Sequence, residues 1–121
     1  MATSAPWKTR ALLAWALCAV CAPALAQTSE AEPPALRQAQ LTRMVRQDCG
    51  SCHGIKLTGG LGPALTREPM AGIPLESLAS IIYHGRPGTA MPGWKSMLSE
   101  ADANWIARQL QAGFPNETRT P

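Results

Sequence analysis

Two cysteines separated by two residues and followed at once by a histidine constrain this chain more than any other feature of its 121 residues. The segment is Cys49-Gly50-Ser51-Cys52-His53. At the end of a helix, this spacing lets each thiol reach one vinyl group of the same haem, while the histidine is held beneath the iron. The motif therefore predicts one covalently attached haem c, with thioethers at Cys49 and Cys52 and with His53 as the proximal axial ligand.

Three other interpretations of a paired-cysteine motif fit the surrounding sequence less well. A thiol redox pair belongs in a βαβ pattern, which the flanking residues do not show. Half of a zinc site needs a second pair of Cys or His ligands, and no such pair follows. A structural disulfide would leave the adjacent histidine without a role. Haem attachment is the interpretation that uses the whole motif.

The first 26 residues differ in composition from the rest of the chain. Basic residues precede an apolar run at 11–26, which ends in Ala24-Leu25-Ala26, the small-x-small pattern of a signal-peptidase site. The run is shorter than the roughly 20 residues that a membrane-spanning helix needs. We therefore expect a signal peptide at 1–26, a mature chain from Gln27, and export to a compartment where thiols tend to be oxidised.

The charge of the expected mature chain argues against one class of partner. From Gln27 onward there are nine Lys and Arg against eight Asp and Glu, which leaves a net charge of +1. Nucleic-acid binding would require a basic stripe, and it gains no support. No apolar span remains after the leader, so we expect no stable membrane insertion.

Three apolar patterns with helical spacing, and no convincing strand pattern, predict an all-α fold. The helices are expected at 35–49, from Pro74 to a stop at Gly85, and from the N-cap Ser99 to Gly113. The stretch 54–73 is rich in Gly and Pro and is predicted to be an ordered loop.

The domain boundaries follow from these elements. The folded domain is expected at 35–113. A flexible acidic strip at 27–34 precedes it, and a tail at 114–121 follows it.

A six-coordinate haem iron needs a second axial ligand, and the side chains available after the leader are Met44, Met70, Met91, Met97 and His84. Met44 lies on the apolar face of the first expected helix and Met97 just before an N-cap, so packing is the simpler role for both. Met70 lies in the loop, and its position alone does not exclude it as the ligand. For His84, at the end of the second helix, we weigh a surface role above ligation. Met91 is favoured because the constrained, non-helical segment around it has small neighbours and can hold a thioether over a metal.

The ligand pair has an electronic consequence. A neutral thioether favours ferrous iron, so His with Met raises the reduction potential above that of two histidines. Filling both axial positions also leaves no vacant site for a substrate, which favours electron exchange over catalysis.

These residues resemble a class I cytochrome c over about 36–112. The likeness rests on the attachment box at 49–53, on Gly62-Pro63 and on the stretch 88–92. It implies a small class I fold with three main helices around one haem. It also implies that the backbone carbonyl of Pro63 accepts a hydrogen bond from the imidazole of His53, which fixes the ring.

The segments 57–65 and 84–94 resemble cytochrome c55X more narrowly. These are small periplasmic cytochromes associated with the haem-c and haem-d nitrite reductase of denitrifying bacteria. The resemblance implies a periplasmic carrier of single electrons to that reductase, supplied by an upstream quinol-linked donor.

Other roles stay open. The chain could supply electrons for maturation of the reductase's d-type haem, serve another redox enzyme, or act as a sensor that releases Met91 to admit a gas. A basic set from the segments expected around the haem could steer an acidic partner, although ordinary solvation explains it equally: Lys56, Arg67, Arg86 and Lys95.

Overall fold

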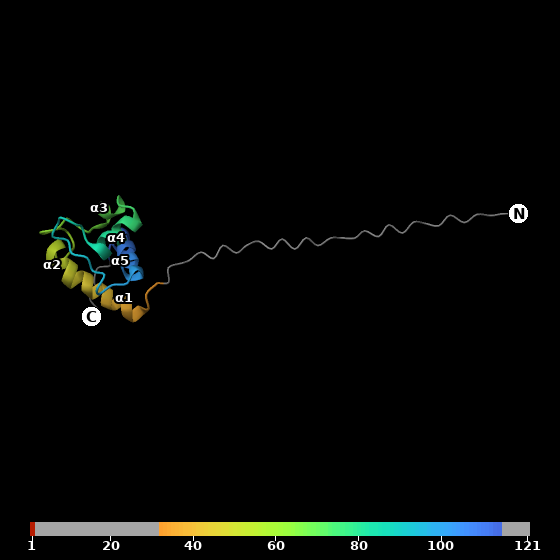
Figure 1. Cartoon of the computed structure of the whole chain (residues 1–121), viewed down its shortest axis with the longest axis horizontal. Coiled ribbons are helices and arrows are strands. Elements are labelled where there is room, and N and C mark those ends of the chain that lie inside the picture. Colours follow the sequence, from red (N-terminus) through yellow and green to blue (C-terminus); the bar gives the residue numbers. More distant parts are fainter. Residues whose placement is uncertain (2–31, 115–121) are drawn as a thin grey trace, which may run out of the picture.

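The computed structural model describes residues 32–114 together with Met1. The expected leader at 1–26, most of the strip at 27–34 and most of the tail at 114–121 therefore lie outside the described residues. Helices follow one another along the described chain, and no strand occurs within it (Figure 1). They are α1 (Ala35–Met44), η1 (Val45–Cys49), α2 (Gly50–His53), α3 (Arg67–Ala71), α4 (Leu75–His84) and α5 (Glu100–Ala112). The predicted all-α class is confirmed.

The first helical segment runs further than the predicted 35–49. α1 passes into η1, a π-helix, and then into α2 with helical backbone angles at both junctions. The helix ends only at Gly54, where φ is +87°. The attachment motif is thus helical itself, since Gly50 within it keeps a right-handed backbone with φ of −61° and the left-handed residue comes only at Gly54.

A short helix, α3, interrupts the predicted loop at 54–73. Its five residues are too few to show a helical period, so the sequence pattern missed it. Pro69 is its third residue, where the backbone N–H would have no partner inside the helix. Gln111 of α5 donates hydrogen bonds to the carbonyls of Met70 (3.3 Å) and Ile73 (2.7 Å), which fixes this segment against α5.

The other two helices begin and end close to the predicted residues. α4 starts after Pro74 and ends at Gly85, where φ is +77°. α5 starts after Ser99, whose hydroxyl accepts a hydrogen bond from the Asp102 amide at 3.1 Å. The Asp102 carboxylate accepts in return from the Ser99 amide at 3.0 Å, which completes a capping box.

One apolar core joins these helices, with α5 packed against α4 and α3 and lying beside α1 in Figure 1. α5 contributes the aromatic and aliphatic face that the sequence predicted. The buried side chains of the whole core include Leu41, Val45, Leu78, Ile82, Leu98, Trp105, Ile106 and Leu110. Fully burying one such side chain contributes about 2 kcal/mol.

A part-buried ion pair ties α1 to the start of α5. The Arg37 guanidinium donates to the Asp102 carboxylate at 2.8 Å, and Asp102 is 6% exposed. Burial alone would raise the pKa of Asp102, but the hydrogen bonds from Arg37 and Ser99 outweigh it, so the pKa is lowered. The same hydrogen bond raises the pKa of Arg37.

This ion pair makes part of the stability depend on pH. Because the folded-state pKa of Asp102 lies below its unfolded value of about 4, the pair stabilises the fold at higher pH and ceases to do so as pH falls through the folded-state pKa. Asp102→Asn should lower the free energy of unfolding by about 2 kcal/mol near neutral pH. Urea unfolding should show the gap between variant and parent shrinking as the pH falls below about 4. A gap that is equally wide in acid would show that the carboxylate charge contributes nothing.

Candidate haem-binding site

The two cysteines of the attachment motif lie on adjoining helices with different exposure. Cys49, the last residue of η1, is half-buried, and Cys52 in α2 is exposed. Within residues 32–114, neither cysteine takes part in a disulfide. Burial, with a smaller contribution from the charge of Asp48, raises the pKa of Cys49 to about 11. Before haem is attached, the Cys49 thiol is therefore mostly protonated at neutral pH.

The ring of His53 is buried and oriented by a backbone contact. Its Nδ1 lies 2.7 Å from the carbonyl oxygen of Pro63. A carbonyl can only accept a hydrogen bond, so Nδ1 must carry the proton. In the neutral ring the other nitrogen, Nε2, then keeps its lone pair, which is the state that binds a metal. One hydrogen bond thus fixes both the orientation and the tautomer of His53.

The loop that supplies Pro63 folds back on the end of α2. The Gly59 amide donates to the His53 carbonyl at 2.8 Å, and the Gly62 amide donates to the Cys52 carbonyl at 2.8 Å. A Cβ at Gly62 would lie 2.6 Å from Cε1 of His53. The imidazole therefore packs directly on bare backbone, and no other residue fits at position 62 without moving it.

Met91 lies in a loop whose ends are joined. The Arg86 amide donates to the Met91 carbonyl at 3.2 Å, and the Trp94 amide donates to the Tyr83 carbonyl at 3.0 Å. A Cβ at Gly93 would lie 2.6 Å from the carbonyl oxygen of His84, so the chain after Met91 packs against the end of α4 backbone to backbone. The Met91 side chain is half-buried.

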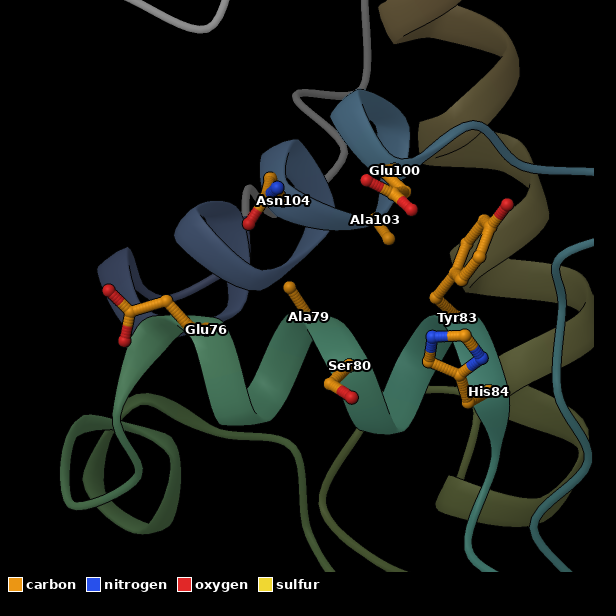
Figure 2. Close-up of a pocket in the computed structure, with 8 residues that line it drawn as sticks. All are labelled: Glu76, Ala79, Ser80, Tyr83, His84, Glu100, Ala103 and Asn104. Atoms are coloured by element: carbon orange, nitrogen blue, oxygen red, sulfur yellow. The ribbon is translucent and has the colours of Figure 1, made fainter.

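The rival axial ligands occupy other places. His84 is exposed and lines a cavity of about 260 Å³ between α4 and α5. Its ring packs edge to face with Tyr83, with the two ring centroids 4.8 Å apart. Figure 2 shows both rings at one end of α4, on the side of Glu100. Met97 is 50% exposed, whereas Met70 is buried in the core and Met44 packs against it. Met91 stays the predicted distal ligand.

A buried polar atom beside the Met91 loop tests whether haem fits these residues. The indole Nε1 of Trp94 is buried and has no hydrogen-bond acceptor among the described residues. Leaving such a donor unsatisfied costs about 1–3 kcal/mol. A haem propionate is an anionic acceptor that would satisfy it. The sequence alone assigned no site role to Trp94, although Trp94 is the last residue of the segment 84–94 that resembles cytochrome c55X.

The donor set as a whole suits haem. It comprises two cysteines outside any disulfide, the imidazole of His53, the thioether of Met91 and the buried indole donor of Trp94. Among the described residues, no three His, Cys, Asp or Glu side chains gather into a site for a free metal ion. The residues therefore fit a metal that arrives inside a macrocycle, which needs only axial ligands from the protein.

Comparison with known proteins identifies the family. The family described as "Cytochrome C oxidase, cbb3-type, subunit III" matches residues 36–108. A cytochrome c55X of Stutzerimonas stutzeri is 56% identical over 85 residues, which are 70% of this chain and 75% of the relative. The chain belongs to the c-type cytochromes, in the cytochrome c55X family.

Solved structures agree with this assignment. The c-type cytochrome NirC superposes with a TM-score of 0.65 at 55% identity, over 66% of this chain and 94% of that chain. The resemblance predicted from the sequence is therefore confirmed. As a c-type cytochrome, the chain is a haem-binding electron-transfer protein. Within residues 32–114, no helix has both the length and the apolar character needed to span a bilayer.

A cytochrome domain of this kind also occurs inside a larger chain. A Dihydro-heme d1 dehydrogenase of Pseudomonas aeruginosa is 36% identical over 94 residues, which are 78% of this chain but 17% of that protein. The structure of the Dihydro-heme d1 dehydrogenase NirN in complex with DHE superposes with a TM-score of 0.53 at 33% identity, over 65% of this chain and 16% of that chain.

Packing of His53 on Gly62 makes a direct prediction. Gly62→Ala places a methyl group against the ring and should lower the free energy of unfolding by about 1–3 kcal/mol. It should also reduce the share of purified protein that carries haem with a low-spin spectrum. Gly72→Ala is the matched control, since a Cβ there meets nothing nearer than 4.0 Å. Equal haem loading and identical spectra for the two variants would refute close confinement of the ring.

Proposed function

We propose that this cytochrome is a periplasmic carrier of single electrons to dissimilatory nitrite reductase, with one haem attached through Cys49 and Cys52. His53 and Met91 would be its axial ligands. The observation that supports this most is the contact of His53 Nδ1 with the Pro63 carbonyl, which leaves Nε2 as the metal-binding nitrogen. Haem iron supplies the redox chemistry, changing between the ferric and ferrous states by one electron.

The chain's own residues favour transfer over catalysis. His53 is held by Pro63, and Met91 lies in a loop closed on α4, so both axial positions can be filled by the protein. Filled positions keep oxygen, nitrite and other small ligands away from the iron. Backbone contacts on both sides also limit rearrangement when the charge changes, which suits repeated electron transfer.

The reductase as partner is supported by the relatives. The segments 57–65 and 84–94 resemble cytochrome c55X, and the overall identity to that family is 54–56%. Four basic side chains are exposed and suited to a brief, electrostatically steered encounter with an acidic partner: Lys56, Arg67, Arg86 and Lys95. Such an interface would bury less than about 1,200 Å². A quinol-linked donor would reload the carrier, and removal of residues 1–26 would release it into the periplasm.

A second role is favoured by one specific finding, the similar domain within the Dihydro-heme d1 dehydrogenase. A dehydrogenase must pass on the electrons that it removes from its substrate. A separate cytochrome with the same kind of domain could accept them one at a time. In that role the chain would serve maturation of the d-type haem by accepting electrons from the dehydrogenase, which is the reverse of the direction expected from the sequence.

The ligand assignment makes the first prediction of this proposal. Met91→Ala should open the sixth coordination position, so that carbon monoxide binds rapidly to the reduced protein. The reduction potential should fall, within the roughly 0.8 V range that axial ligands span. Met70→Leu is the control, because it preserves the volume of a buried side chain and should leave the spectrum unchanged. If Met91→Ala retains the parent's low-spin thioether spectrum, Met91 is not the ligand.

The choice between the two roles can be measured directly. Reduced holo-protein is mixed in a stopped flow with oxidised nitrite reductase, with and without nitrite. Rapid, saturable reoxidation that continues while nitrite lasts would establish donation to the reductase. Slow transfer there, together with rapid reduction of the oxidised cytochrome by the dehydrogenase and its substrate, would assign the maturation role instead.

A further inference from the structure

Two rigid parts of the chain carry the two proposed axial ligands. α1, η1 and α2 run without a break to His53. The segment that contains Met91 is hydrogen-bonded to the end of α4. For both ligands to meet one iron, these two parts must keep a fixed separation. A contact that joins them directly would therefore control the distal bond.

Arg37 and Asp102 provide such a contact. Besides binding Asp102, Nη2 of Arg37 donates to the carbonyl oxygen of Met97 at 2.9 Å. Asp102 in turn accepts from the amide of Ser99 at 3.0 Å. The pair thus makes hydrogen bonds to the backbone at both Met97 and Ser99. Arg37 makes its hydrogen bond from the first turn of α1.

The backbone at Met97 and Ser99 is connected to the Met91 loop by a hydrogen-bonded turn. The amides of Met97 and Leu98 both donate to the carbonyl of Trp94, at 2.9 Å and 3.0 Å. Leu98 is 5% exposed and anchors the turn in the core. Trp94 is bonded to the end of α4 and lies three residues after Met91. A shift at Met97 would therefore act on Trp94 through these two hydrogen bonds.

We propose that Arg37 and Asp102 are a positioning pair that holds the Met91 thioether against the haem iron. This rests on the proposed function, in which Met91 is the distal ligand. A thioether is a neutral, weakly held ligand, so a small displacement of its backbone favours dissociation more than it would for an imidazole. Without the pair, the protein stays folded around its haem, but the sixth position opens more often.

A purely structural role for the pair predicts a different result. If Arg37 and Asp102 only cap α5 and join two helices, their loss lowers stability without a particular effect on the distal ligand. The two roles are separated by comparing variants of equal stability. Leu110→Ala supplies the comparison, because Leu110 is buried near the other end of α5 and far along the helix from the pair.

The experiment measures carbon monoxide association with the reduced holo-protein. Asp102→Asn and Arg37→Met should each raise the rate by about tenfold, whereas Leu110→Ala with a matched unfolding midpoint should not. Arg37→Lys keeps the charge but loses the planar fork, so it should restore the parent rate only in part. Equal rates for all variants, or the same increase in Leu110→Ala, would overturn the proposal.

A double variant separates this proposal from the ligand assignment. In the Met91→Ala background the sixth position is already open, so adding Asp102→Asn should leave the carbon monoxide rate unchanged. A further tenfold increase in that background would show that the pair acts on something other than Met91, and the positioning role fails. If Met91→Ala alone leaves the spectrum and the rate unaltered, the ligand assignment itself fails.

Discussion

The hydrogen bond between the ring of His53 and the carbonyl of Pro63 determines the rest of the site. Because the carbonyl only accepts, the contact places the proton on Nδ1 and leaves Nε2 for the iron. It requires the chain after α2 to turn back sharply, which the amides of Gly59 and Gly62 accomplish by binding the last carbonyls of that helix. The turn, the glycines and the end of α2 are therefore one arrangement that serves one imidazole.

The distal side also depends on close backbone packing at a glycine, although other residues provide it. The chain after Met91 lies on the end of α4 without intervening side chains, and Gly93 makes that approach possible. The turn at 94–98 then leads into the capping box of α5, where Asp102 meets Arg37. The His53 ring is thus held by the Pro63 carbonyl, and the backbone around Met91 is held by hydrogen bonds to its neighbours.

Much of this arrangement could be predicted from local sequence. Ser99 and Asp102 mark the start of α5, Gly85 marks the end of α4, and the buried face of α5 follows the helical period. What local patterns could not give was the continuation of the first helix to His53, since the π-helix has no sequence signature and the stop at Gly54 depends on its left-handed backbone. The short α3 is stabilised by Gln111 from far along the chain, which no local pattern shows.

The site shows the same division between local and distant information. The attachment motif is contiguous, so spacing alone predicted its cysteines and histidine. The contact of Pro63 came from family resemblance, because it joins residues ten positions apart through a turn. Only the three-dimensional structure shows the indole of Trp94 without an acceptor among the described residues and the hydrogen bonds of Arg37 to Met97 and Asp102.

The central claim is that one haem is covalently bound through both cysteines of the motif, and intact mass under denaturing conditions tests it most directly. Denaturation removes a haem that is held only by axial bonds but cannot remove one held by thioethers. The account predicts a single species with the mass of the mature polypeptide plus one haem, and no thiol that an alkylating reagent can modify. A bare polypeptide in which both Cys49 and Cys52 are alkylated would contradict it.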